Sequence, residues 1–130
     1  MNNNAKIFLI VVIVLVLGTI ATVLVRGGGG ISSSSGKYDQ FAICLKDKGA
    51  MFYGAFWCPH CQAQKKMFGS SAKLLPYTEC STLNGSGQTQ ICIDKGIKGY
   101  PTWEFADGSR LNGEIPLTQL AEKTGCVLPQ

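Results

Sequence analysis

The residues best suited to chemistry are Cys58 and Cys61, which form a Cys-x-x-Cys pair. The apolar run Ala50–Phe56 before them predicts a buried strand, and Pro59–Phe68 predicts a helix. The pair therefore lies where a strand leads into a helix N-terminus. Unpaired N–H groups and the helix dipole favour an anion at such a place, and so favour a thiolate at Cys58.

Pro59 and His60, between the two cysteines, strengthen this interpretation. The imidazole of His60 adds positive charge or a hydrogen bond near a Cys58 thiolate, and Pro59 suits a first helical turn. The cysteines are about one helical turn apart, so Cys61 can resolve a mixed disulfide formed at Cys58. These residue types at this spacing predict thiol–disulfide exchange.

Other interpretations of the pair remain open. Half of a structural zinc site would need a second close pair, which the remaining cysteines do not form: Cys44, Cys80, Cys92 and Cys126. A metal carrier using Cys58, Cys61 and His60 would suit copper or zinc, and a structural adaptor would hold an inert disulfide. We expect redox chemistry, with no metal and no cofactor.

The charge balance gives no sign of nucleic-acid binding. The 130 residues carry a formal charge of +4, with twelve Lys and Arg against eight Asp and Glu. Two of the basic residues, Lys6 and Arg26, flank an apolar segment, and the rest of the chain is nearly neutral. Six cysteines in so short a chain fit disulfides formed in an oxidising compartment.

The apolar segment Ile7–Val25 is nineteen residues without a charge. At about 1.5 Å per residue it nearly spans a hydrocarbon core of about 30 Å. It exceeds the usual apolar region of a cleaved signal peptide, and no clear small-x-small site precedes Arg26, so we favour a retained signal anchor in residues 1–26. The cysteines then predict a single-pass cell-membrane protein with its C-terminal domain outside the cytoplasm.

The remaining chain divides into a linker and one domain. Residues 27–36 are rich in Gly and Ser and predict a flexible linker, and residues 37–130 form the domain. Its expected helices and strands alternate and then end in a hairpin and a helix: helix Tyr38–Lys48, strand Ala50–Phe56, helix Pro59–Phe68, short helix Ser70–Leu75, strand Pro76–Cys80, helix Thr89–Lys95, strand Thr102–Phe105, strand Ser109–Asn112 and helix Pro116–Thr124. This order predicts an α/β fold with a mixed sheet and helices on both faces.

The active-site stretch Trp57–Cys61 after a core strand, with Tyr100-Pro101-Thr102 before the hairpin, resembles the thioredoxin fold. The resemblance implies a cis Tyr100–Pro101 peptide beside the Cys-x-x-Cys pair. It also implies that the backbone of Tyr100 pairs with a bound substrate strand, and we expect Trp57 to help bind that substrate.

A closer similarity covers about residues 40–126. Phe52–Cys61, Lys65–Gly69, Glu79-Cys80-Ser81 and Gly96–Trp103 resemble the thioredoxin-like domain fused to bacterial homologues of vitamin K epoxide reductase. With one apolar segment, this chain is expected to lack the four-helix quinone-reducing bundle of the fused form. The resemblance therefore implies an anchored partner of such a membrane enzyme, with Cys58 and Cys61 as its redox pair.

The same resemblance suggests that Cys80–Cys92 is a structural disulfide and that Cys44 and Cys126 form the remaining pair; buried free thiols are the alternative. Thioredoxins carry a buried acid six positions before the first cysteine, where this chain has Phe52. Glu104 is a candidate acid to replace it.

The expected activity is that of a protein thiol–disulfide oxidoreductase acting on substrate proteins. Pro59-His60 between the cysteines resembles oxidising Dsb-type proteins, and stabilising a Cys58 thiolate makes the protein an oxidant. A quinone-linked membrane enzyme of the vitamin K epoxide reductase type would then reoxidise it. A reductase for extracytoplasmic thiols is the alternative.

Overall fold

The computed structural model describes residues 2–26 and 35–130, with side chains described for 2–17 and 35–130. The chain separates into two compact units, Met1–Ser33 and Ser34–Gln130, which are described one at a time. Most of the predicted linker, residues 27–34, lies outside the described residues.

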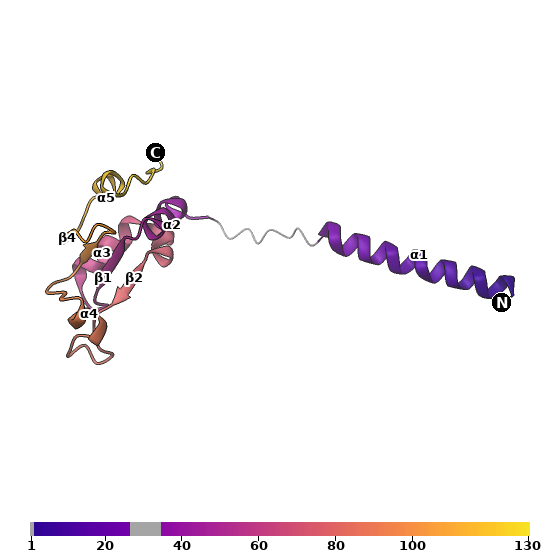
Figure 1. Cartoon of the computed structure of the whole chain (residues 1–130), viewed down its shortest axis with the longest axis horizontal. Coiled ribbons are helices and arrows are strands. Elements are labelled where there is room, and N and C mark those ends of the chain that lie inside the picture. The colour runs from indigo at the N-terminus through magenta and orange to yellow at the C-terminus, as the bar shows by residue number, and fades with distance from the viewer. Residues whose placement is uncertain (1, 27–34) are drawn as a thin grey trace. The chain divides into compact units, whose positions relative to one another are not determined.

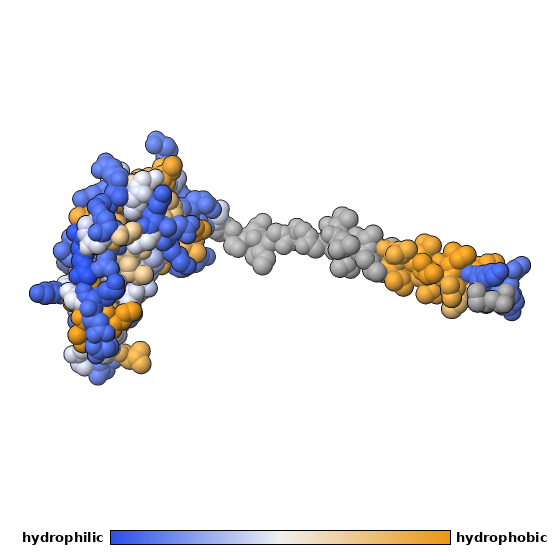
Figure 2. Space-filling model, in the orientation of Figure 1, coloured by the Kyte–Doolittle hydropathy of each residue, from blue (hydrophilic) through white to orange (hydrophobic). Residues whose placement is uncertain are grey.

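The first unit contains a single described helix, α1 (Asn3–Arg26) (Figure 1). Every side chain from Ile7 to Leu17 is apolar and exposed, and Figure 2 shows them as a continuous hydrophobic surface. In the described part of the chain, no helix combines the length and apolar character that crossing a membrane requires. The predicted segment Ile7–Val25 extends past Leu17, the last residue of α1 whose side chain is described.

The second unit is built on a four-stranded mixed sheet with strand order β2-β1-β3-β4. Its elements follow the predicted order: α2 (Asp39–Asp47), β1 (Met51–Gly54), α3 (Pro59–Met67), the 3-10 helix η1 (Gly69–Leu74), β2 (Tyr77–Glu79), α4 (Gln90–Asp94), β3 (Thr102–Glu104), β4 (Arg110–Asn112) and α5 (Leu117–Thr124). Strand β1 pairs in parallel with β2 and antiparallel with β3, and β4 pairs antiparallel with β3. The arrangement fits a thioredoxin-like fold.

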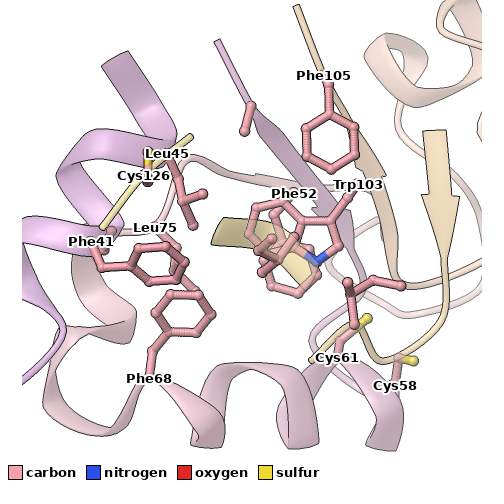
Figure 3. Close-up of a cluster of buried hydrophobic side chains, with 14 of the residues drawn as sticks. Phe41, Leu45, Phe52, Cys58, Cys61, Phe68, Leu75, Trp103, Phe105 and Cys126 are labelled. Carbon is pink, nitrogen blue, oxygen red and sulfur yellow. The ribbon is translucent and has the colours of Figure 1, made fainter. Parts of the chain in front are cut away.

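Helices cover both faces of the sheet, as the sequence predicts. On one face Phe52 of β1 and Trp103 of β3 stack with ring centroids 4.9 Å apart and pack against α2, α3 and α5. Phe41 of α2 stacks on Phe68 in the same cluster, which Figure 3 shows extending to Cys61. Fully burying aromatic side chains of this size stabilises a fold by roughly 1.5–3 kcal/mol each.

The opposite face carries a smaller apolar cluster. Tyr53 of β1 packs there with Ile97 and with the disulfide-bonded Cys80 and Cys92, so α4 covers this side. Alternation along β1 explains the division, because Phe52 and Tyr53 point to opposite faces of the sheet. Phe52 and Tyr53 thus pack into two separate apolar clusters.

One predicted boundary is wrong. The strand expected over Ala50–Phe56 ends at Gly54, because the chain then turns and the Cys58 N–H donates to the Ala55 carbonyl at 3.0 Å. The turn places Cys58 at the start of α3. The other predicted elements of the domain are confirmed, with ends that differ by at most one residue.

Candidate active site

Cys58 occupies the N-cap of α3. Its backbone is extended (φ −75°, ψ 119°), and its carbonyl accepts the first helical hydrogen bond from the Gln62 N–H. Pro59 takes the first helical position, where the missing N–H would have no partner. The structure thus places Cys58 where the sequence predicts it, at a helix N-terminus that favours an anion.

Two of the six cysteines are free thiols, and both belong to the Cys-x-x-Cys pair. The exposed fractions of Cys58 and Cys61 are 5% and 1%. The other four form the disulfides Cys44–Cys126 and Cys80–Cys92, the two pairings that the resemblance implies. In the described residues, no three His, Cys, Asp or Glu side chains come together in an arrangement that can hold a metal ion.

The cis-proline segment lies directly beside Cys58. The Tyr100–Pro101 peptide is cis, in agreement with the resemblance. The Cys58 thiol donates to the Tyr100 carbonyl over a sulfur–oxygen distance of 3.7 Å. The Trp57 and Tyr100 rings meet edge to face with centroids 6.0 Å apart. The predicted residues Trp57, Cys58 and Tyr100 therefore lie together, and the cis peptide joins them to Pro101, whose side chain is fully buried.

The loop after β2 supports Trp57. The Cys80 N–H donates to the Gly54 carbonyl at 2.7 Å, and Ser81 Oγ then accepts from the Trp57 indole N–H at 2.8 Å. The Cys80–Cys92 disulfide ties this point of the loop to α4. The disulfide thus holds the residues that orient Trp57 beside Cys58.

Exposed apolar side chains lie in the chain just before Cys58 and in the loop after β2; these three, Phe56, Trp57 and Leu83, are called the apolar rim. Phe56 and Trp57 are each half exposed, and Leu83, in the same supported loop, is fully exposed. Gly85 of this loop lies against the two aromatic rings, since a Cβ on it would come within 3.6 Å of Trp57 and 3.8 Å of Phe56. The two half-exposed rings of Phe56 and Trp57 thus present apolar surface next to the redox pair.

The His60 side chain pairs with Glu114, a residue that the sequence alone does not point to. Its Nδ1 lies 2.7 Å from Glu114 Oε1, and the His60 side chain is 68% exposed. Glu114 precedes α5, far from His60 in the sequence. No local pattern joins the two residues, because tertiary contacts bring them together: Gln64 of α3 bonds to the backbone of Ile115, the residue after Glu114.

Cys61 faces β2 across Gly54. A Cβ on Gly54 would lie 2.9 Å from Cys61 Sγ and 2.9 Å from Cε2 of Tyr77. Burial raises the pKa of the Cys61 thiol to about 12, against opposing effects of the Ala55 backbone and Lys65. Glycine in a strand often marks a place where another group approaches the backbone closely. Gly54 is therefore the feature of the sequence that could have indicated the close packing of Cys61 and Tyr77 here.

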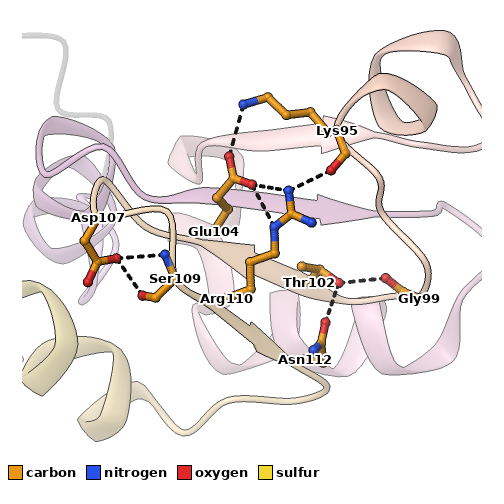
Figure 4. A network of polar contacts seen from close by, with 8 residues as sticks. All are labelled: Lys95, Gly99, Thr102, Glu104, Asp107, Ser109, Arg110 and Asn112. Atoms are coloured by element: carbon orange, nitrogen blue, oxygen red, sulfur yellow. Dashed lines mark hydrogen bonds and ion pairs between the residues drawn. The ribbon is translucent and has the colours of Figure 1, made fainter.

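The prediction for Glu104 is wrong. Its carboxylate accepts hydrogen bonds from Arg110 and Lys95, on the α4 side of the sheet (Figure 4). Trp103, the preceding residue of β3, points to the opposite face and packs in the cluster that contains Cys61. Because neighbouring residues of a strand alternate in direction, Glu104 cannot reach Cys61.

Comparison with known proteins supports a redox function. No family model matches the chain. The chain is 48% identical over 105 residues to the thiol-disulfide oxidoreductase LTO1 of Arabidopsis thaliana. The match covers 77% of this chain and 28% of that relative, so the chain spans less than a third of the relative's length. The similarity supports a thioredoxin-like oxidoreductase.

Proposed function

We propose that this chain is a protein thiol–disulfide oxidoreductase whose redox pair is Cys58 and Cys61. The observation that carries the proposal is the environment of Cys58, a free thiol at a helix N-terminus that also contacts the Tyr100 carbonyl. Cys61 is the other free thiol, on the same helix. The 48% identity to a thiol-disulfide oxidoreductase supports the same activity.

The reaction begins with the oxidised Cys58–Cys61 pair. A substrate thiolate attacks Cys58 Sγ, the Cys58–Cys61 bond breaks, and Cys61 leaves with the electron pair and takes up a proton. A second substrate thiolate then attacks the substrate sulfur of the mixed disulfide, and Cys58 leaves as a thiolate. The substrate gains a disulfide, and the two electrons remain on the Cys58–Cys61 dithiol.

The substrate surface in this proposal is the apolar rim beside Cys58. An extended segment of a substrate protein pairs with the backbone of Tyr100, while its apolar side chains contact Phe56, Trp57 and Leu83. The exposure of these three side chains supports this position, since Phe56 and Trp57 directly precede the buried Cys58. Substrate contacts are then mainly apolar and backbone-mediated, which suits an enzyme that accepts different thiol proteins.

Trapping tests the activity. In full-length protein expressed in its native host, Cys61→Ala should accumulate mixed disulfides with substrates through Cys58, because the resolving thiol is missing. Cys58→Ala is the matched control and should trap none. The adducts appear on non-reducing gels and disappear with reductant. An absence of adducts with Cys61→Ala under oxidising growth would remove the proposal's main support.

The direction of electron flow in this proposal is oxidation of substrates. Pro59 and His60 between the cysteines, and a Cys58 thiolate at the helix N-terminus, both favour the reduced form. We expect a reduction potential near roughly −120 mV, measured by equilibration with thiol–disulfide buffers. A value near roughly −270 mV would indicate a reductase instead.

The proposal includes attachment to the cell membrane, with the domain outside the cytoplasm. It is supported by nineteen uncharged residues at Ile7–Val25, by the exposed apolar surface Ile7–Leu17, and by two disulfides that suit an oxidising compartment. In this proposal residues 27–36, which are rich in Gly and Ser, connect the anchor to the domain.

The proposed membrane partner is a quinone-linked enzyme of the vitamin K epoxide reductase type, which reoxidises the Cys58–Cys61 dithiol. The support is the sequence similarity of residues 40–126 to domains fused to such enzymes. The test is a Cys61→Ala adduct in the membrane fraction that contains this enzyme. If cells lacking the enzyme keep Cys58 and Cys61 as oxidised as normal cells do, the proposed partner is wrong.

A further inference from the structure

The proton of Cys61 needs an acceptor that the sequence analysis did not find. The Cys61 side chain is 1% exposed, and burial raises its pKa to about 12, so it is a neutral thiol at neutral pH. Closing the disulfide requires the Cys61 thiolate, and opening it returns a proton to Cys61. Phe52 has no ionisable group, and Glu104 lies on the far face of the sheet.

Strand register brings Tyr77 next to Cys61. In the parallel pairing of β1 with β2, Phe52 is opposite Tyr77 and Gly54 is opposite Glu79. Since Gly54 has no side chain, the Cys61 sulfur and the edge of the Tyr77 ring both approach it closely, each 2.9 Å from where a Cβ would be. The side of the Tyr77 ring therefore reaches the space around Cys61.

Glu79 completes this arrangement. The Tyr77 hydroxyl donates to Glu79 Oε2 at 2.7 Å. The other oxygen, Oε1, accepts from the backbone N–H groups of Ser81 at 2.8 Å and Phe56 at 3.2 Å. The carboxylate is thus fixed at the turn that leads into α3, and it is partly open to water.

We propose that Tyr77 and Glu79 form the proton path of Cys61, with Glu79 as the acceptor and the Tyr77 hydroxyl as the relay. The inference rests on the proposed function and adds residues to its site. Burial and the hydrogen bond to Glu79 raise the pKa of Tyr77, so its hydroxyl stays protonated and passes a proton on without itself ionising.

The charged and titratable groups around Cys61 fit this assignment. From its own helix α3, Cys58 and Lys65 act on it, and from β2 the groups are Tyr77 and Glu79. Lys65 Nζ lies 3.4 Å from the centroid of the Tyr77 ring, and its charge favours the Cys61 thiolate. Among these groups, Glu79 is the only carboxylate.

Protons and electron pairs are conserved when the Cys58–Cys61 disulfide closes and when it opens. When a mixed disulfide at Cys58 is resolved, the Cys61 proton passes to the Tyr77 oxygen while the Tyr77 proton passes to Glu79. The Cys61 thiolate attacks Cys58 Sγ, a Cys58–Cys61 bond forms, and the other sulfur leaves with the electron pair. The proton on Glu79 then exchanges with water. When the disulfide opens, the same path returns a proton to Cys61.

The test uses full-length reduced protein and dithiobis(nitrobenzoate), a chromogenic aromatic disulfide. Attack by Cys58 releases one coloured thiolate, and resolution by Cys61 releases a second, so the two steps are recorded as separate phases. The variants are Glu79→Gln, which keeps an oxygen for the Phe56 and Ser81 N–H groups, and Tyr77→Phe. Glu104→Gln is the matched control, because it removes a carboxylate from the face of the sheet opposite Cys61.

We expect both site variants to keep the first phase and to slow the second at neutral pH by about tenfold or more. The second phase should then rise with hydroxide concentration between about pH 6 and pH 9, because water replaces the lost acceptor. Glu104→Gln should keep the normal profile.

A second phase that matches the wild type in either site variant overturns the proposal, as does an equal slowing of both phases. If Glu79→Gln does not fold, Tyr77→Phe decides by the same criteria. Loss of the first phase in the wild-type protein would instead count against the proposed function, so the two failures can be told apart.

Discussion

Gly54 is the residue on which the geometry of the redox pair depends most directly. A methyl group there would lie 2.9 Å from both Cys61 Sγ and Tyr77 Cε2, closer than packed atoms allow. We expect Gly54→Ala to lower the free energy of unfolding by about 1–3 kcal/mol, as overpacked cores do, and to slow closure of the Cys58–Cys61 disulfide. Denaturant unfolding and the two-phase thiol assay measure the two effects.

Gly99→Ala is the control for this prediction, because a Cβ on Gly99 meets no atom within 4 Å. It should leave both quantities close to the wild-type values. Equal behaviour of the two alanine variants would mean that β2 and α3 can separate at little cost, and that Cys61 is held less firmly than the contacts around Gly54 indicate.

His60 is the residue expected to tune the redox equilibrium. It lies in the first turn of α3 and pairs with Glu114. Removing the imidazole takes away a group that can stabilise the Cys58 thiolate, and so destabilises the reduced form. We expect His60→Ala to make the reduction potential more negative by about 30 mV, which corresponds to about 1.4 kcal/mol. An unchanged or more positive potential would contradict this role.

The hairpin β3–β4 carries an ion-pair network with a predictable pH dependence. Although burial opposes it, hydrogen bonds from Arg110 and Lys95 lower the pKa of Glu104. A carboxylate whose pKa falls on folding stabilises the fold above its unfolded pKa, and this contribution disappears as the pH falls through the folded pKa. The network therefore stabilises the domain at neutral pH and not in acid.

We expect Glu104→Gln to lower the free energy of unfolding by about 1 kcal/mol at neutral pH, the usual size for a partly exposed network. The difference from wild type should shrink as the pH falls below about 4, where the wild-type carboxylate also becomes neutral. Urea unfolding across this pH range measures it. A difference independent of pH would indicate a packing effect and not a charge effect.

The two disulfides have separable roles at the level of the elements. Cys44–Cys126 joins α2 to the segment after α5 across 82 residues, and Cys80–Cys92 closes 12 residues beside Trp57. We expect replacement of either pair by serine to lower the free energy of unfolding by about 2–4 kcal/mol, with the larger loss for the longer loop.

Only replacement of the Cys80–Cys92 pair should also slow the reaction of Cys58 with a thiol-containing substrate protein, because it releases the loop that orients Trp57 through Ser81. The serine variant of Cys44 and Cys126 serves as the matched control, since its pair lies away from this loop. If both variants react like the wild type, the loop does not position the substrate surface.

At the scale of the whole molecule, local pattern predicted the element order well. Apolar spacing and turn residues placed every helix and strand, because each of these signals is contained within a few neighbouring residues. The Cys-x-x-Cys pair was identified for the same reason. The strand predicted before the pair, Ala50–Phe56, is longer than the observed strand β1, because the sequence stays apolar into the turn that ends at Cys58.

The surroundings of Cys61 were not predictable in this way. The register of β2 against β1 places Tyr77 and Glu79 near Cys61. Glu104 lies on the other face of the sheet from Cys61, because Trp103, its neighbour in β3, points to the face that carries Cys61. Both facts depend on pairing between distant segments, which a single sequence does not encode locally. The pairing of His60 with Glu114 depends on tertiary packing in the same manner.

We expect the N-terminal segment and the domain that carries the redox site to have separate functions. The contacts described above for Cys58, His60 and Cys61, including the apolar cluster that contains both cysteines, lie within the unit Ser34–Gln130. We expect protein that begins at Lys37 to keep both phases of the thiol assay. We also expect it to leave the membrane fraction, because it lacks the apolar surface Ile7–Leu17.

Cell fractionation with an alkaline wash of the membranes measures retention of the full chain and the shorter form. If the full chain is released as readily as the shorter form, the N-terminal segment is no anchor; if the shorter form loses the first phase, the site depends on more than its own domain.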